Sequence, residues 1–497
     1  MSENQSSYRQ IMKATSIFGG VQVFNILISI IRSKFVALLL GPAGMGIMGL
    51  LTSTTGIIGN LTNFGLGTSA VKDVAIANSS GDQKKIEEVV IVVRRMVWIT
   101  GIIGLLAMLV LSSLLSQLTF GNKNYTLAFI WISLTMLLNQ LSSGQLVILQ
   151  GLRKLKYLAK ANLFGSFLGL FVTIPLYYFF GFDGIVPGII GTSVISLIVS
   201  WYFSGKIDLK RSELTQAQIF EQGKGMLKMG FLISLNGILV VGVSYIIRIF
   251  ISRIGSVEQV GLYSAGFAII NTYVSLIFNA MSTDYYPRLS AISDNNKLCR
   301  QTVNQQVEIA LLILAPILIF LLVFINWIII LLYSRDFTAV NEMIQWAAIG
   351  MFFKTISWSI GFIFLAKGTT KLFLWNELVA NLYILGFNML GFYYWGLTGL
   401  GLAFAFSYFI YTVQVFIITK VKFEFNVDRS LIKIFLFQFS MAVMLFILIR
   451  LLNNPMTYIA GFIFIFFSCW YSIFQLNKRL SLINLLNKLK QKLTSAS

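Results

Sequence analysis

The 497-residue sequence contains no histidine and only two cysteines, and both shortages limit its chemistry. Without imidazole there can be no Ser-His-Asp triad, no histidine metal ligand and no histidine proton relay. Cys299 and Cys469 are far apart and form neither a disulfide framework nor a C-x-x-C motif. We therefore expect no metal site and no bound cofactor.

Charged residues are also scarce. They make up 11% of the chain, whereas a soluble globular protein has about 25%. Hydrophobic residues make up 57%, and the mean hydropathy is +0.81. This composition excludes a water-soluble enzyme and a disordered chain, and it predicts an all-α polytopic membrane protein. The net charge of +20 would indicate nucleic acid in a soluble protein, but in a membrane protein it indicates which loops face the cytoplasm. We expect no nucleic-acid partner.

Fourteen stretches are long and apolar enough to cross a bilayer, which takes about 20 mostly apolar residues. The predicted spans are residues 17–40, 45–67, 91–114, 126–149, 159–180, 184–204, 228–251, 260–283, 308–332, 342–365, 373–394, 397–418, 431–450 and 456–475. An even number of spans places both termini on the same side.

The basic residues identify that side as the cytoplasm. With the N-terminus inside, thirty Lys and Arg residues fall in the termini and the inner loops. Only Lys123, Arg253, Arg335 and Arg450 fall outside. This asymmetry follows the positive-inside rule and supports the order of the spans.

A short internal repeat predicts two similar halves. Ile30-Ile31-Arg32 recurs as Ile246-Ile247-Arg248, and Gly46 recurs at nearly the same offset as Gly261. Transporters are often built from such halves around a midplane site. The predicted domains are an N-lobe of six helices (1–205), a cytoplasmic linker (206–227), a C-lobe of six helices (228–420), a C-terminal helix pair (421–475) and a basic amphipathic cytoplasmic tail on the membrane surface (476–497).

Polar and charged side chains inside the spans are the candidate binding residues. A charge near the bilayer centre costs about 2.5–3.5 kcal/mol on the insertion scale, so it persists where it faces a watery cavity or a partner. We predict two lobes around a central cationic cavity in which a bound group contacts the candidates. They are Arg32, Arg248, Lys354, Asn25, Gln140, Glu377, Asn381 and Asn388. For Glu377 the alternative is that it only neutralises Lys354.

A cavity with several cations and one acid favours an anionic ligand. A pyrophosphate fits well, because arginine presents a planar fork to phosphate oxygens. The glycine-rich segment 41–46 joins two predicted spans and lacks the Lys-Ser/Thr of a P-loop, so the sequence carries no sign of ATP hydrolysis.

Three segments resemble the polysaccharide flippases of the multidrug/oligosaccharidyl-lipid/polysaccharide exporter superfamily. The segment 33–46, SKFVALLLGPAGMG, is similar to the first-span signature of that family. The segment 118–125, LTFGNKNY, and the run from Asp336 to Glu377 resemble translocases of O-antigen and enterobacterial common antigen. One departure concerns Met351, where relatives can carry an acid, and it leaves the driving force open.

The resemblance implies a non-enzymatic flippase of the bacterial inner membrane. It would move an undecaprenyl-pyrophosphate-linked oligosaccharide, such as an O-antigen, common-antigen or capsule repeat unit, from the cytoplasmic to the periplasmic leaflet by alternating access. Its expected partners are this lipid-linked sugar, membrane lipids, and the polymerase and chain-length proteins of the same pathway.

Two other functions are the alternatives. A multidrug extruder of the same superfamily is disfavoured, because cationic drugs bind acidic and aromatic cavities. A polytopic glycosyltransferase or O-antigen polymerase is disfavoured, because the predicted outer loops are short and contain no histidine.

Overall fold

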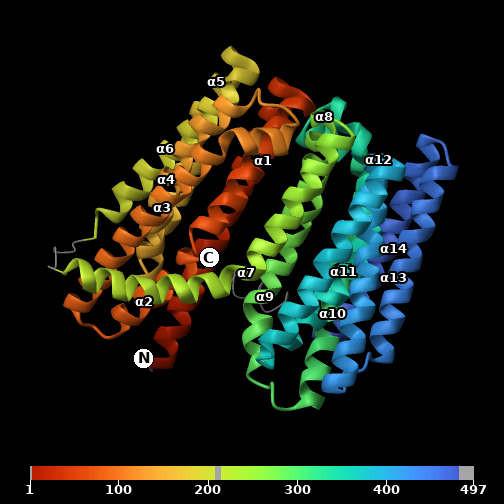
Figure 1. Cartoon of the computed structure of the whole chain (residues 1–497). Helices are drawn as coiled ribbons and strands as arrows, with labels where there is room; N and C mark the ends of the chain where they lie inside the picture. The colour runs from red at the N-terminus through yellow and green to blue at the C-terminus, as the bar shows by residue number, and fades with distance from the viewer. Residues whose placement is uncertain (1–2, 208–213, 481–497) are drawn as a thin grey trace, which may run out of the picture. The chain divides into compact units, whose positions relative to one another are not determined.

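A computed structural model describes residues 3–207 and 214–480, and this part of the chain is helical and contains no strand. The all-α prediction is confirmed (Figure 1). The helices are α1 (Glu3–Thr62), α2 (Leu66–Ser79), α3 (Gln83–Phe120), α4 (Thr126–Gly151), α5 (Leu155–Phe180), α6 (Ile185–Ser204), α7 (Gln216–Ile254), α8 (Val257–Ala268), α9 (Ser275–Ser290), α10 (Asn296–Leu332), α11 (Asn341–Ala366), α12 (Thr370–Phe423), α13 (Arg429–Leu451) and α14 (Asn454–Leu480).

The chain forms two compact units. The first contains residues 1–261 with Leu332–Asp336, and the second contains Leu262–Leu331 with residues 337–497. Helix α7 therefore belongs to the first unit by its contacts, although the repeat assigns residues from 228 onward to the C-lobe. The predicted domain boundaries stay a prediction, and most of the predicted tail lies outside the described residues.

Ten helical segments of the described part are long and apolar enough to cross a membrane. Three of these segments each contain two predicted spans. Non-helical backbone at Gly41 divides α1, Gly396 divides α12, and a 3-10 turn at Gly181–Gly184 separates α5 from α6. Both dividing glycines have positive φ, 63° and 56°, a conformation that costs glycine little. The predicted span at 260–283 is not among the ten, so the count of fourteen is not confirmed.

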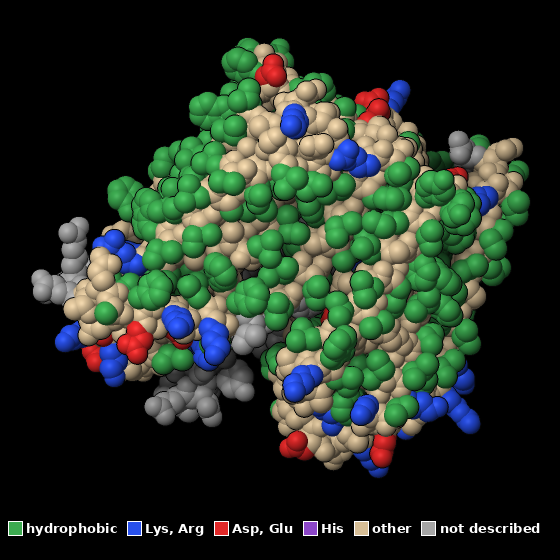
Figure 2. Space-filling view, viewed as in Figure 1, with side chains coloured by type: hydrophobic (Ala, Val, Ile, Leu, Met, Phe, Trp, Pro, Cys, Tyr) green, Lys and Arg blue, Asp and Glu red, His purple; other side chains and the backbone are tan. Residues whose placement is uncertain are grey.

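The outer surfaces of the helices are apolar. Val110, Phe179 and Leu331 are 81%, 75% and 73% exposed, which suits contact with acyl chains rather than water. On the face in Figure 2, hydrophobic side chains cover the helical stems of both units, and Lys and Arg gather toward helix ends. The multi-pass membrane prediction is confirmed by these helices, and the side on which the termini lie stays a prediction.

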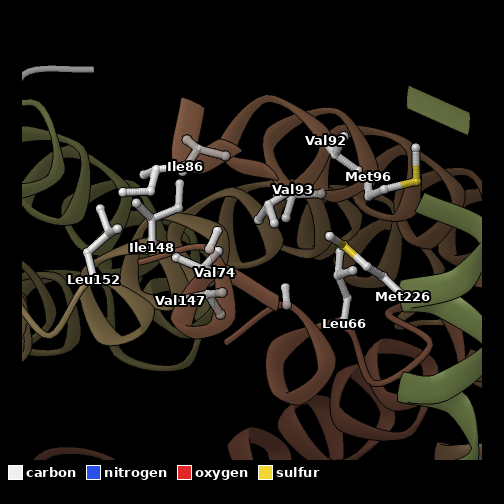
Figure 3. Packing of buried hydrophobic residues seen from close by; sticks show 14 residues of the cluster. Leu66, Val74, Ile86, Val92, Val93, Met96, Val147, Ile148, Leu152 and Met226 are labelled. Carbon is white, nitrogen blue, oxygen red and sulfur yellow. The ribbon is translucent and has the colours of Figure 1, made fainter. Parts of the chain in front are cut away.

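The first part of helix α7 packs against the first unit and is not part of an apolar, span-length segment. Thr215 caps it in a capping box with Gln218, and its apolar, span-length part starts only at Gly237. Met226 of α7 joins a buried cluster with Leu66, Met96 and other side chains of α2, α3 and α4 (Figure 3). Part of the predicted linker is thus helical and packed.

Two repeat-related glycines form a reciprocal contact within the first unit. A Cβ at Gly46 would overlap the carbonyl oxygen of Val257, and a Cβ at Gly261 would overlap the carbonyl oxygen of Pro42. Gly261 follows Gly46 by 215 residues, and Val257 follows Pro42 by the same 215. Such reciprocity is what two-fold related segments produce, so the contact supports the repeat.

Gly261→Ala is expected to destabilise the folded protein by about 1–3 kcal/mol, because the new methyl group has no space beside the Pro42 carbonyl. The matched control is Gly237→Ala, where a Cβ has no atom within 4 Å and removal of a helical glycine stabilises by up to about 1 kcal/mol. Thermal unfolding in detergent measures both. Equal unfolding midpoints for the two variants would contradict the close contact.

Candidate functional site

A cavity of about 270 Å³ in the second unit brings two of the predicted residues together. It is bounded by α11 and α12. Lys354, Ser357 and Gly361 line it from α11, and Glu377 lines it from α12. The α11 residues recur at three- and four-residue steps, so they share one face of that helix.

The Lys354 ammonium has only weak partners in this cavity. Its Nζ atom donates a hydrogen bond to Asn271 Oδ1 at 3.3 Å. It also lies 5.1 Å from the ring centroid of Tyr408 and 5.6 Å from that of Phe404, within reach of cation–π attraction. None of the ion pairs among the described residues involves Lys354. Its positive charge is therefore not neutralised by a carboxylate.

Glu377 is held by a network on its own helix rather than by Lys354. Its carboxylate accepts a hydrogen bond from the Tyr411 hydroxyl. Asn376 Nδ2 donates to the same hydroxyl at 3.2 Å, and Gln414 Nε2 donates to Asn376 Oδ1 at 2.8 Å. The alternative that Glu377 neutralises Lys354 directly has no ion pair to support it in the described part of the chain.

Arg32 is the second cation without a carboxylate partner. It lies in the first unit against α5, where a Cβ at Gly169 would come within 3.2 Å of its Nη2 atom. The Tyr177 hydroxyl, two turns further along α5, is close enough to interact with its charge. The Nε atom is buried without a hydrogen bond, and none of the ion pairs in the described segments includes Arg32. Arg32 does not line the Lys354 cavity.

Arg248, the repeat partner of Arg32, lies in α7 and so in the same unit as Arg32. Its Nη1 atom donates to the Ser244 hydroxyl and, at 3.2 Å, to the Ser244 carbonyl oxygen one turn earlier. The sequence places this serine one turn before the arginine. From the internal repeat we expect Arg32 and Arg248 to bind a pyrophosphate from opposing lobes, and this expectation stays a prediction.

The four predicted amides lie in different surroundings. Asn25 Oδ1 is buried without a partner on α1. Gln140 Nε2 donates to Thr100 Oγ1 at 2.9 Å and lines a separate cavity of the first unit. Asn381 and Asn388 are buried on α12, and each donates at 2.8 Å to a carbonyl of its own helix one turn earlier. Neither lines the Lys354 cavity, so their contact with sugars stays a prediction.

Aromatic side chains are the part of the Lys354 cavity that sequence reasoning missed. One wall of the cavity is formed by Trp358, Phe362, Phe373, Tyr408 and Tyr411. From composition alone, these aromatic residues are expected to be ordinary lipid-facing residues. A signal was present, since Trp358 and Phe362 follow Lys354 by four and eight residues and so share its helix face. Together the rings, the ammonium and the carboxylate can bind an anionic group with an attached polar or ring-shaped moiety.

The described residues contain no group of three or more Cys, Asp and Glu side chains placed to hold a metal ion. The groups that the two units offer to a ligand are polar or cationic. They are unneutralised cations, amides and hydroxyls embedded in apolar helices.

Comparison with known proteins gives matches at the level of family and fold. A model of the polysaccharide biosynthesis protein family matches residues 35–342. The lipid III flippase of Escherichia coli (strain K12) is 23% identical over 349 residues, which cover 69% of this chain and 82% of that protein. The resemblance to polysaccharide flippases is confirmed by these matches.

Solved structures share the fold. An inward closed structure of the lipid II flippase MurJ superposes with a TM-score of 0.67 at 14% identity, covering 93% of this chain and 98% of that chain. An inward-facing multidrug transporter of the MATE family in the MOP superfamily gives 0.66 at 15% identity, covering 83% and 96%. These two values are nearly equal, so fold similarity alone does not separate lipid flipping from drug extrusion.

Proposed function

Because the chain belongs to the polysaccharide biosynthesis protein family, we propose that it is a flippase for an undecaprenyl-pyrophosphate-linked oligosaccharide. The transport runs from the cytoplasmic to the outer leaflet of a bacterial inner membrane, with both termini in the cytoplasm. The flippase name of the E. coli relative supports this class of substrate. The repeat unit is that of an O-antigen, a common antigen or a capsule.

One observation carries the proposal: Lys354 is charged, lies inside a membrane-spanning helix and has no carboxylate partner among the described residues. An unneutralised charge is costly in the membrane and is kept where it serves a ligand. The ligand that compensates an ammonium is an anion, and the pyrophosphate is the anionic part of the lipid-linked sugar.

The substrate needs such a site because its head group cannot cross unaided. Leaving a pyrophosphate bare in hydrocarbon costs on the order of tens of kcal/mol by Born estimates. Arg32, Arg248 and Lys354 bind the phosphates, while the undecaprenyl tail stays in the lipid. The amides of Asn25, Gln140, Asn381 and Asn388 form hydrogen bonds to the sugars, and Glu377 belongs to the same binding site. Alternating access of the binding residues to the two sides then moves the head group without exposing it to acyl chains.

The alternative functions predict different results. A multidrug extruder binds cationic drugs, and two unneutralised cations, Arg32 and Lys354, oppose that ligand. A transferase would cleave the sugar–lipid bond, and the described residues offer no histidine for such chemistry. The family model favours neither alternative.

The test is a translocation assay in proteoliposomes with the purified chain. Wild-type protein is expected to move an undecaprenyl-pyrophosphate-linked oligosaccharide to the opposite leaflet, to leave its sugar–lipid bond intact, and not to extrude ethidium. Extrusion of ethidium without lipid translocation would overturn the proposal in favour of a multidrug extruder. Transfer of the sugar would overturn it in favour of an enzyme.

A further inference from the structure

The first unit contains a second cavity, of about 300 Å³, between the second half of α1 and helices α3 and α4. Its lining is polar but carries no charged side chain. The lining residues include Gly56, Asn60, Gly104, Asn139, Gln140 and Ser143. Hydroxyl and amide groups thus meet in a cavity inside an otherwise apolar bundle.

Glycines create the open space. A Cβ at Gly56 would have no atom within 4 Å, so this part of the helix faces empty volume. At Gly104, across the cavity, a Cβ would come within 2.9 Å of Thr62 Oγ1 and 3.5 Å of Met136. Small residues on α1 and α3 therefore leave a gap that larger side chains would close.

The polar groups keep hydrogen-bonding capacity for a ligand. Asn60 Nδ2 donates to the Gly56 carbonyl oxygen at 2.8 Å, and Gln140 Nε2 donates to Thr100 at 2.9 Å, which leaves their amide oxygens as acceptors. The side chains of Asn139 and Ser143 make no hydrogen bond to any other described residue. The cavity therefore offers donors and acceptors together, as a ligand with several hydroxyl groups requires.

The lining excludes other ligand classes. A phosphate would require basic groups, and a cationic drug would require acidic or aromatic ones; the cavity lining has none of these. A bare metal ion is held by oxygens at about 2.0–2.6 Å, a much narrower site than a cavity of this volume. The volume is at the lower end of the range for small-molecule pockets, about 300 Å³. A neutral sugar ring matches both the size and the mixed polarity.

We propose that this cavity binds an uncharged sugar of the lipid-linked substrate. The inference rests on the proposed function and deepens it, because it separates recognition of the sugar from recognition of the pyrophosphate by the cations. Gln140, a predicted substrate residue, contributes to this sugar site from α4.

The experiment compares two probes: undecaprenyl pyrophosphate, and the same lipid carrying three neutral N-acetylhexosamines. Equilibrium binding to the purified protein in detergent is measured for wild type, Gly56→Leu and Asn139→Ala. The leucine fills the open space beside residue 56, and the alanine removes an amide that makes no side-chain hydrogen bond to another described residue. Gly386→Leu is the matched control, because that helical glycine also has no atom within 4 Å and lines neither cavity.

Wild type and Gly386→Leu are expected to bind the sugar-bearing lipid about tenfold more tightly than the bare lipid, the effect of one or two net hydrogen bonds. Gly56→Leu and Asn139→Ala are expected to lose most of this preference and to keep their affinity for the bare lipid. An unchanged preference in both variants would overturn the sugar site. An equal loss of affinity for both probes in the two variants would also overturn it. Failure of wild type to bind the bare lipid would instead contradict the proposed function.

Discussion

Lys354→Gln is expected to slow translocation of an undecaprenyl-pyrophosphate-linked oligosaccharide at least about 30-fold, since loss of a desolvated charge pair costs about 2–5 kcal/mol. Glutamine is one atom shorter than lysine and can still donate a hydrogen bond, but it carries no charge. The cation–π contacts with Tyr408 and Phe404 are lost as well, although they contribute only about 0.5–2 kcal/mol and do not involve substrate. The measurement is the initial rate of lipid translocation in proteoliposomes.

Two further variants make the Lys354 result specific. Lys354→Arg is expected to retain a substantial part of the rate, because the cation remains within the cavity. Glu377→Gln removes an acid from the same cavity and is expected to leave pyrophosphate binding unchanged or tighter. A loss of binding in Glu377→Gln as large as that in Lys354→Gln would show that the cavity responds to disruption of its network rather than to charge, and would contradict the assignment.

Arg32→Met is expected to lower translocation at least about tenfold while leaving the thermal stability of the substrate-free protein unchanged or raised. The half-buried Arg32 side chain lies against Gly169, with its Nε atom buried and unbonded and, among the described residues, without a carboxylate. A charge near the bilayer centre costs about 2.5–3.5 kcal/mol on the insertion scale, and the shorter, uncharged methionine removes that cost. Higher stability together with slower translocation in Arg32→Met would mean that Arg32 serves to bind a ligand rather than to stabilise the fold.

The matched comparison for Arg32 is Arg479, whose Nε atom donates to Glu308 at 2.8 Å. Arg479→Met leaves the buried Glu308 carboxylate without its partner and is expected to lower the unfolding midpoint. Thermal unfolding in detergent and translocation rates are measured on both variants. A fall in stability for Arg32→Met equal to that for Arg479→Met would assign Arg32 a structural role.

Much of the fold could be predicted because hydropathy reports directly on lipid contact. The breaks between predicted spans at residues 41–44 and 395–396 coincide with the non-helical glycines Gly41 and Gly396. The start of α7 could not be predicted in the same way. Its packing against α3 depends on a close approach, in which Gly223 lies against Met96, and a single glycine in a polar segment does not indicate which helix it contacts.

The candidate site could be predicted from the sequence only at positions where a charged side chain lies in an apolar span and raises the free energy of the folded protein in the membrane. A lysine or arginine in an apolar span is conspicuous, and Lys354 and Glu377 do line one cavity. The aromatic wall of that cavity could not be predicted, because Trp and Phe are equally common on lipid-facing surfaces. The neutral cavity of the first unit could not be predicted either. Thr, Ser and Asn side chains in spans usually form hydrogen bonds to the backbone of their own helix, as Thr62 does to the Ile58 carbonyl oxygen.

The most direct test of the account is the affinity of the purified protein for undecaprenyl pyrophosphate compared with undecaprenol, which has the same tail without phosphate. Recognition of the pyrophosphate by cations within the apolar helices predicts binding at least about 100-fold tighter for the pyrophosphate, because charge-assisted bonds contribute about 1.5–3 kcal/mol each. Equal affinities for the two lipids would show that the protein recognises only the tail, and would contradict the account.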